Sequence, residues 1–140
     1  MSVIKAFLFD LDGVIVDTAI YHYQAWKRLA NELGFDISEE FNERLKGVSR
    51  MESLDIILEH GGLSLPEEKK NELAAEKNQW YLELVSRMTS DDILPGVANF
   101  FSQVRKANLM TALGSVSKNA PLILERIGMS EAYDVIIDGT

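Results

Sequence analysis

The 140-residue sequence contains no cysteine, which excludes disulfides, zinc–thiolate sites and cysteine nucleophiles. No apolar run approaches the length of a transmembrane helix, and the run at the N-terminus is too short for a signal peptide. Basic residues are few: 14 Lys and Arg stand against 22 Asp and Glu, and the net charge of -8 argues against a surface for nucleic acid or anionic membranes. These absences predict a cytoplasmic protein with no nucleic-acid or membrane partner and with a small ligand.

The residues that are present are typical of a globular protein. Hydrophobic residues make up 46% of the chain and charged residues 26%, and the length suffices for one domain with a real core. The sequence has no internal repeats and no low-complexity tracts.

Two aspartates follow the first apolar run, in the segment FLFDLDGVIVDT. Asp10 and Asp12 are two residues apart, so in an extended chain their carboxylates emerge on one face while Leu11 points away. Ionised carboxylates at the end of a buried strand need a positive partner, and Mg²⁺ is the simplest one because it prefers oxygen ligands and usually accompanies phosphate. The alternative is that the two aspartates only form a turn before Gly13.

The pattern of apolar residues predicts an α/β fold. Residues 3–9 form a continuous apolar stretch, typical of a strand that is covered on both faces in a parallel sheet. A block of helices follows, expected at 17–33, 41–45, 49–58 and 64–88. After a linker at 89–96 we expect a helix at 97–107, a strand at 109–113, a helix at 117–127 and a strand at 135–137. Strands separated by helices indicate a Rossmann-like parallel sheet core, here incomplete with about three strands.

The uninterrupted helical block predicts a division into domains. Residues 1–16 and 93–140 are expected to form the α/β core, residues 17–88 an inserted α-helical cap, and residues 89–92 a hinge linker. Ligands of open α/β sheets bind at the carboxyl ends of the strands, so the cap is expected to lie over the aspartate pair.

The second predicted strand ends in polar residues that suit a phosphate group. In LMTALGSVSKNAP, the strand is followed by Ser115, Ser117, Lys118 and Asn119 and then by a helix. Main-chain amides, a hydroxyl group and a lysine charge at such a place form a phosphate cradle. The alternative is that Ser117 only caps the helix.

Four segments together resemble the β-phosphoglucomutase family of the haloacid dehalogenase superfamily. They are FDLDGV, DTAIYHYQAWKRLA, NERLKGVSR and GSVSKNAP, and the resemblance extends over essentially all 140 residues. The first motif is shared by very many phosphatases, whereas LKGVSR together with SKN is more specific to the mutases. This sequence has Gly114 and Val116 where the family usually has alanines, and only local adjustment is expected from them.

The resemblance implies an enzymatic activity and a role for each matching residue. Asp10 would be the nucleophile that becomes a phosphoaspartate, Asp12 the general acid and base, and both would bind Mg²⁺. The substrate-binding residues that it implies are His22, Trp26, Leu45, Lys46, Gly47, Val48, Ser49, Arg50 and Lys77 in the cap, and Ser115, Val116, Ser117, Lys118 and Asn119 in the core. The implied reaction interconverts β-D-glucose 1-phosphate and D-glucose 6-phosphate, through glucose 1,6-bisphosphate, in carbohydrate metabolism.

Several of these residues also have a purely structural interpretation. His22 and Trp26 lie on the apolar stripe of their helix, where packing in the core explains them equally well. Ser49 begins a capping box, and Lys77 lies in the polar run EEKKNELAAEKN, which is typical of a solvated helix face. Arg50 at the start of a helix is unfavourable for the macrodipole, which favours a role in binding an anion.

The resemblance also implies elements that these 140 residues do not contain. A family member would continue through a third-motif lysine, fourth-motif acids and the remaining strands of the sheet. Three strands with an apolar edge would offer a template for another chain, and two aspartates alone are a poor magnesium cage. We therefore expect a fragment or truncated product of a longer enzyme, or a chain that gains strands by self-association or exchange, although the family is monomeric. The alternatives are a sugar-phosphate phosphatase and an inactive phosphosugar-binding fragment.

Overall fold

The computed structural model describes residues 3–140, which form two compact units. One unit comprises the chain up to Thr18 and from Val85 onward, and the other comprises Ala19–Leu84. Within residues 3–140, no helix combines the length and the apolar character that crossing a membrane requires.

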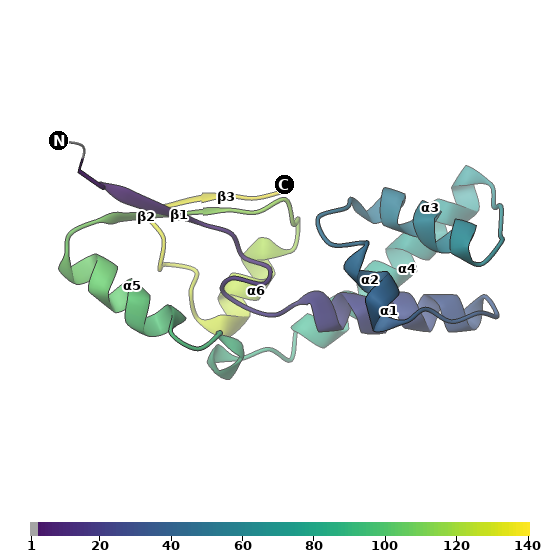
Figure 1. Ribbon diagram of the computed structural model, residues 1–140, viewed down its shortest axis with the longest axis horizontal. Helices are drawn as coiled ribbons and strands as arrows, with labels where there is room; N and C mark the ends of the chain where they lie inside the picture. Colours follow the sequence, from purple (N-terminus) through teal and green to yellow (C-terminus); the bar gives the residue numbers. More distant parts are fainter. Residues whose placement is uncertain (1–2) are drawn as a thin grey trace. The chain divides into compact units, whose positions relative to one another are not determined.

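The first unit contains a parallel sheet of three strands, β1 (Ala6–Phe9), β2 (Met110–Gly114) and β3 (Val135–Ile137), in the order β1-β2-β3 (Figure 1). Leu8 of β1 lies opposite Ala112 of β2 in the ladder. Strand β1 is shorter than the predicted strand at 3–9, and residues 1 and 2 of the predicted core lie outside the described residues. The sheet confirms the prediction of a parallel α/β core with three strands.

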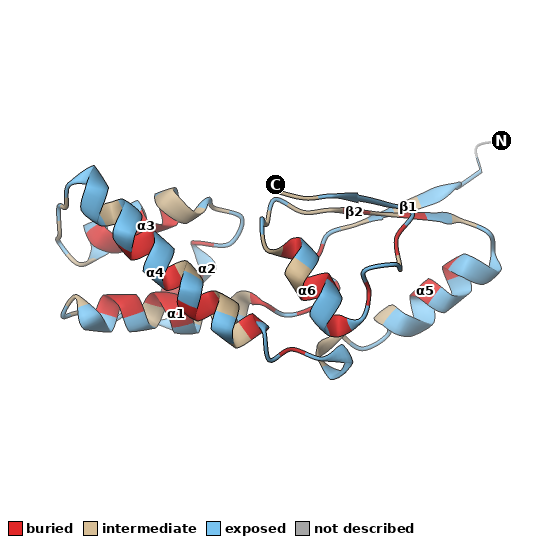
Figure 2. Ribbon diagram, turned by 180° about the vertical axis from the view of Figure 1, so that it is seen from behind, coloured by how far each residue is buried: buried red, intermediate tan, exposed pale blue. Residues whose placement is uncertain are grey.

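Two helices, α5 (Val97–Lys106) and α6 (Ala120–Ile127), lie on the same face of this sheet (Figures 1 and 2). Aromatic side chains fill the space between the sheet and α5. Phe9 stacks on Phe101 with 4.6 Å between the ring centroids, and Tyr133 meets the ring of Phe101 edge-on at 5.2 Å. This aromatic layer and the buried side of α6 make up the core of the unit.

Within residues 3–140 the opposite face of the sheet is uncovered in this unit, so the predicted burial of strand 3–9 on both faces is not found among these residues. Leu8 is 75% exposed and Ile137 65% exposed, whereas Phe7 and Phe9, which point to the helices, are half-buried. The cause is topological. Both crossovers run in one direction across the sheet, and right-handed crossovers in one direction place all of their helices on one face.

The predicted linker, 89–96, is partly ordered into a short 3₁₀-helix, η1 (Ser90–Asp92). Thr89 and the third residue of the turn form a capping box at its start. The amide of Leu94 then donates to the carbonyl of Ile15 at 2.8 Å. The linker is thereby fastened to the loop that follows β1.

The second unit is entirely helical among its described elements, as predicted. Its helices are α1 (Ala19–Glu32), α2 (Glu39–Glu43), α3 (Arg50–His60) and α4, which spans Glu67–Val85. Ser49 caps α3 as predicted, because its hydroxyl oxygen accepts from the amide of Glu52 at 3.4 Å. Helix α4 begins later than the predicted Ser64. The core of the unit is formed by large buried side chains: Trp26, Leu29, Leu54, Ile57 and Tyr81.

The aromatic layer predicts that replacing each of two neighbouring phenylalanines by alanine lowers the free energy of unfolding by a different amount. Phe101 is 5% exposed and Phe100 39% exposed, although both rings pack on β1. The change Phe101→Ala should lower the free energy of unfolding by about 3 kcal/mol, since it leaves a cavity that the sheet cannot fill. Phe100→Ala should lower the free energy of unfolding by no more than about 1.5 kcal/mol. Urea denaturation followed by circular dichroism measures both, and equal losses would contradict this packing.

Candidate active site

A tight turn after β1 presents the first aspartate to solvent. Leu11 is fully buried, and its carbonyl oxygen accepts from the amide of Ile15 at 2.9 Å. Gly13 adopts the left-handed conformation with φ of +81° and donates to the carbonyl of Val16 at 2.7 Å, a position that few other residues tolerate. Asp10 is exposed while Leu11 points inward, as the alternation of the strand predicts.

The second aspartate occupies a different environment. Asp12 is half-buried, and its carboxylate accepts a hydrogen bond from the hydroxyl of Thr18, which is fully buried. Burial raises the pKa of Asp12 and the nearby charge of Asp10 raises it further, while the bond from Thr18 opposes the rise. A carboxyl group with a raised pKa keeps its proton to higher pH, which suits a general acid. Thr18 was not among the predicted site residues, and its signal in the sequence is a hydroxyl just before α1.

The loop between β2 and α6 is organised by serine hydroxyls. The amide of Ser117 donates to the hydroxyl of Ser115 at 3.1 Å, and the amide of Asn119 donates to the hydroxyl of Ser117 at 3.1 Å. The N-cap residue of α6 is Asn119, so the alternative in which Ser117 caps this helix is wrong. Because these amides are already used, a phosphate group would depend more on hydroxyls, on the exposed Lys118 and on the amides that are left.

The ends of the three strands share one open hollow of about 530 Å³. Its lining includes Asp10, Ser115 and Val116, which the sequence predicted, together with Asp138 and Gly139, which it did not. The amide of Thr140 donates to the carboxylate of Asp138 at 2.8 Å, and hydrogen bonds from Thr140 lower the pKa of Asp138. An acid directly after the third apolar strand was the signal that could have revealed it. The hollow therefore brings a carboxylate and a hydroxyl-bearing loop together.

The carboxylates of this unit fit Mg²⁺ only together with a ligand. In the part of the chain that the structure describes, no three His, Asp or Glu side chains are grouped closely enough to hold a metal ion. Mg²⁺ in proteins usually binds through one or two carboxylates and completes its shell with water and substrate phosphate. Each of the two carboxylates accepts one hydrogen bond, Asp10 from the amide of Leu11 at 2.7 Å and Asp12 from the hydroxyl of Thr18, and Asp10 is the more exposed of the two.

The helical unit contains a buried amine among aromatic rings. Lys77 is 2% exposed, and its ammonium nitrogen lies 3.0 Å from Nδ1 of His22 and 4.2 Å from the ring of Trp26. The imidazole of His22 also stacks on Tyr81, with 4.0 Å between the ring centroids. The alternative of a solvated helix face is therefore wrong for Lys77. A buried cation among neutral partners is a place where an anion would be stabilised.

The charged groups of this cluster shift one another's pKa values. Burial lowers the pKa of Lys77 to about 7, and the nearby charge of Arg50 adds to this effect. The pKa of His22 falls to about 3, because burial and the charges of Lys77 and Arg50 all disfavour the imidazolium. His22 is thus neutral at physiological pH and can accept a hydrogen bond from the lysine.

The predicted segment between α2 and α3 has mixed surroundings. Leu45 is buried, and Lys46 forms an ion pair with Glu43 at 2.7 Å. Gly47 has a φ of +74° and turns the chain toward α3, so that Val48 and Arg50 are half-buried. The structure therefore gives Leu45 and Ser49 packing and capping roles, and it leaves Arg50 as the residue of this segment whose charge reaches the Lys77 cluster.

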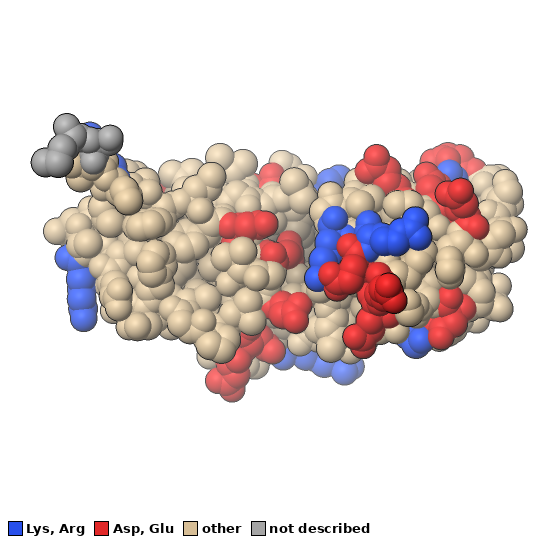
Figure 3. All heavy atoms as spheres, viewed as in Figure 1, with Lys and Arg blue, Asp and Glu red and all other residues tan. Residues whose placement is uncertain are grey.

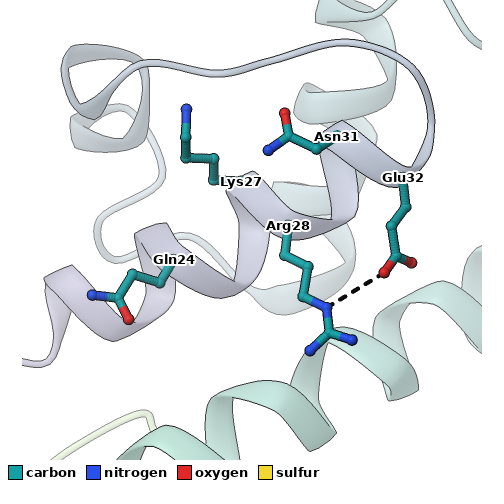
Figure 4. A pocket seen from close by; sticks show the side chains of 5 residues that line it. All are labelled: Gln24, Lys27, Arg28, Asn31 and Glu32. Atoms are coloured by element: carbon teal, nitrogen blue, oxygen red, sulfur yellow. Dashed lines mark hydrogen bonds and ion pairs between the residues drawn. The ribbon is translucent and has the colours of Figure 1, made fainter.

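A second, shallow pocket on α1 carries charges that are already paired (Figure 4). Lys27 binds Asp36 at 2.6 Å, and Arg28 binds Glu32 at 3.4 Å. The guanidinium of Arg28 also lies 4.0 Å from the ring centroid of Trp80. These ion pairs are typical of the solvent-exposed surface of a helix and do not by themselves indicate a binding site.

Known proteins resemble this chain over nearly its whole length. The sequence model of the haloacid dehalogenase-like hydrolase family matches residues 4–140. The β-phosphoglucomutase of Bacillus subtilis is 44% identical over 97% of this chain, and the phosphorylated carbohydrates phosphatase of Thermotoga maritima is 26% identical over 96%. The chain spans 61% of the length of each of these two relatives. The crystal structure of the β-phosphoglucomutase of Clostridium difficile superposes with a TM-score of 0.90 at 51% identity, covering 98% of this chain and 62% of that one.

The bond from Thr18 predicts a specific change in the titration of Asp12. Thr18→Val removes a hydrogen bond that favours the carboxylate, so the pKa of Asp12 should rise further above its ordinary value. Carbon NMR of the carboxyl groups measures this. Thr140→Val is the matched control, because it should raise the pKa of Asp138 and leave that of Asp12 unchanged. An unchanged Asp12 in Thr18→Val would contradict the geometry.

The buried amine predicts a dependence of stability on pH. Below about pH 7 Lys77 is charged in the folded and the unfolded protein, so burying its charge lowers the free energy of unfolding by the full amount. This loss of stability becomes smaller as the pH rises from about 7 toward 10.5, because the folded protein then holds the amine in its neutral form. Lys77→Met should therefore raise the free energy of unfolding more at pH 6 than at pH 10, by a few kcal/mol. Lys69→Met, on an exposed part of the same helix, should show no such difference. A gain that is equal at both pH values would disprove the shifted pKa.

Proposed function

Because this chain belongs to the haloacid dehalogenase-like hydrolase family, we propose that it provides a phosphoryl-transfer site for a phosphorylated sugar. The proposed reaction interconverts β-D-glucose 1-phosphate and D-glucose 6-phosphate through glucose 1,6-bisphosphate. The names of the Bacillus subtilis and Clostridium difficile relatives support this substrate class, as do the LKGVSR and SKN segments of the sequence.

The observation that carries the proposal is the difference between the two aspartates. Asp10 is exposed in the hollow at the strand ends, where a phosphoryl group can reach it. Asp12 is half-buried, its carboxylate accepts a hydrogen bond from Thr18, and its pKa is raised. Two carboxyl groups in such different surroundings can divide the roles of nucleophile and proton carrier.

The proposed sequence of steps uses both carboxyl groups twice. Phosphorylated Asp10 gives its phosphoryl group to a hydroxyl of the sugar phosphate, and Asp12 takes the hydroxyl proton, which yields the bisphosphate. Asp10 then attacks the other phosphorus of the bisphosphate. That phosphoester bond breaks, and the leaving sugar oxygen takes the proton back from Asp12. The site ends in the phosphorylated state in which it began.

The charge of the transferring group is balanced by residues of the first unit. The hydroxyl of Ser115, the ammonium group of Lys118 and nearby main-chain amides are the proposed donors to its oxygens, together with Val116, Ser117 and Asn119 of the same loop. Asp10 and Asp12 are the residues that would hold Mg²⁺, which when bound offsets the repulsion between a carboxylate and a phosphate group.

The helical unit is the proposed cap, with a hinge near residues 89–92. Its buried Lys77 and half-buried Arg50 are the proposed contacts of the second phosphate group. The remaining cap residues would position the sugar and exclude water: His22, Trp26, Leu45, Lys46, Gly47, Val48 and Ser49. The support for this assignment is the buried cation, whose cost in stability is explained by a ligand that carries negative charge.

A sugar-phosphate phosphatase is the second candidate. It is favoured by the exposure of Asp10, which lets water reach a phosphoaspartate, and by the relative from Thermotoga maritima that is named as a phosphatase. The two reactions differ in the acceptor, which is a sugar hydroxyl in one and water in the other.

A coupled assay separates these functions. The substrate is β-D-glucose 1-phosphate with Mg²⁺ and a trace of glucose 1,6-bisphosphate, and both glucose 6-phosphate and free phosphate are measured. The assay uses this chain and a version extended with the part of the Bacillus subtilis relative that the chain does not match. We expect glucose 6-phosphate from the extended version, and a loss of at least about 10³-fold in Asp10→Asn, because the nucleophile is removed.

The matched control for this assay is Asp36→Asn, an exposed carboxylate that pairs with Lys27 on the helical unit. Its activity should equal that of the unchanged protein. Release of phosphate without glucose 6-phosphate would replace the mutase by the phosphatase. Full activity in Asp10→Asn would overturn the proposed site.

A further inference from the structure

The segment that follows β3 lies against the loop that follows β2. The amide of Ser115 donates to the carbonyl of Ile137 at 2.9 Å, and the amide of Gly139 donates to the carbonyl of Ser117 at 3.2 Å. These two hydrogen bonds join main chain to main chain. They hold residues 115–118, which we call the serine loop, against the end of β3.

Gly139 has no room for a side chain in this contact. A Cβ atom added to it would lie 2.2 Å from the carbonyl oxygen of Val116 and 2.9 Å from the carbonyl carbon, and real Cβ atoms essentially never come within 3.0 Å of such atoms. Both atoms belong to the main chain, so no change of rotamer relieves the contact. The φ of Gly139 lies outside the left-handed region, so glycine is required here by the close approach of two main chains.

A turn fixes the segment that carries Gly139. The carboxylate of Asp138 accepts hydrogen bonds from the amide of Thr140 at 2.8 Å and from the hydroxyl of the same residue. An aspartate that binds the main chain two residues further on stabilises a turn. A side chain at position 139 would therefore either displace the serine loop or open this turn, and both changes weaken the hydrogen bonds between the segment and the loop.

The side chains of the serine loop do little to hold it against the sheet. Val116 is 87% exposed, and Lys118 is exposed as well. The hydroxyls of Ser115 and Ser117 each accept from the amide two residues further along the chain, so these bonds shape the loop from within. Besides its connections to β2 and α6, the loop is positioned mainly by its main-chain contact with the segment after β3.

The position of the loop matters because it carries short-range donors. In the view of Figure 3, Lys and Arg side chains are few over the α/β unit, whereas they gather over the helical unit. A phosphate group at the serine loop would therefore depend strongly on hydrogen bonds from hydroxyls and main-chain amides. Such donors stabilise a transferring group only when they are held in place before it arrives.

We propose that Gly139 is a positioning residue for the serine loop. Because Gly139 lacks a side chain, the end of β3 can lie directly on the main chain of Val116 and keep the donors of the loop aimed at the phosphate group. The proposal rests on the proposed function, from which it takes the ligand of the loop. It assigns Gly139 to the alignment of the loop and not to the chemistry.

The change Gly139→Ala tests this role in the 140-residue chain. Hydrogen exchange at the amide of Ser115 should become at least about tenfold faster, because its bond to Ile137 is weakened. The amide of Thr111, which donates to Asp134 elsewhere in the sheet, should change little. The dissociation constant for inorganic phosphate, measured by NMR titration of the loop amides, should rise at least about fivefold.

Two other glycines provide matched controls. Gly114 ends β2 beside the same loop, but a Cβ atom there would meet Leu8 only at an ordinary 3.6 Å. Gly114→Ala should therefore change the affinity for phosphate less than about twofold. Gly61 is as crowded as Gly139, with the ring of Phe35 2.5 Å from an added Cβ atom, but it lies in the helical unit. Gly61→Ala should leave the affinity and the exchange at Ser115 unchanged even where it lowers the stability.

A second pair of variants loosens the same segment without crowding it. Asp138→Ala removes the acceptor of the turn, whereas Asp138→Asn removes the same charge and keeps an acceptor oxygen. Asp138→Ala should therefore bind phosphate at least about twofold more weakly than Asp138→Asn, and its Ser115 amide should exchange faster. Circular dichroism verifies that each variant is folded, and this pair decides the matter if Gly139→Ala is not.

The two measurements separate failure of this role from failure of the proposed function. Unchanged exchange at Ser115 in Gly139→Ala would show that the contact does not hold the loop. Faster exchange with unchanged affinity for phosphate would show that the position of the loop does not matter for binding. Either result overturns the positioning role alone. If the unchanged chain binds no phosphate at the loop amides, the proposed function of the loop fails, and the positioning role fails with it.

Discussion

The site depends on how one short turn separates two like charges. Asp10 and Asp12 leave the same strand two residues apart, and their carboxylates would repel each other in equal surroundings. Leu11 between them is buried, and hydrogen bonds to its carbonyl turn the chain at once. As a result Asp10 stays exposed while Asp12 is drawn against Thr18, where burial raises its pKa. The division of labour that we propose for the two acids follows from this difference.

The same principle, a charge placed where solvent cannot fully reach it, recurs in the helical unit. Lys77 is held by His22 and by aromatic rings, and the charge of Arg50 makes its protonation still less favourable. Burying a cation without a carboxylate costs stability, and a phosphate group is the kind of ligand that would return this stability on binding. Each unit thus carries one electrostatically strained element, and a phosphorylated sugar carries groups suited to both.

Much of this arrangement could be predicted from the sequence, because it depends on local patterns. The alternation FLFDLD predicted that Leu11 points away from Asp10, and the Ser49 capping box predicted the start of α3. What failed depends on contacts between distant segments. The polar run around Lys77 gave no sign of its burial, and the apolar strand β1 gave no sign that one of its faces is open. Within residues 3–140 that face is open because both crossovers run in one direction, which is a property of the topology and not of any one segment.

The proposal that Asp10 accepts the phosphoryl group while Asp12 handles the proton can be tested without turnover. Beryllium trifluoride with Mg²⁺ mimics a phosphoryl group on an aspartate, and fluorine NMR detects the bound species. On the chain extended with the remainder of the Bacillus subtilis relative, we expect a bound signal in the unchanged protein and in Asp12→Asn, and none in Asp10→Asn. A bound signal that persists in Asp10→Asn, or no bound signal in the unchanged protein, would show that Asp10 is not the acceptor.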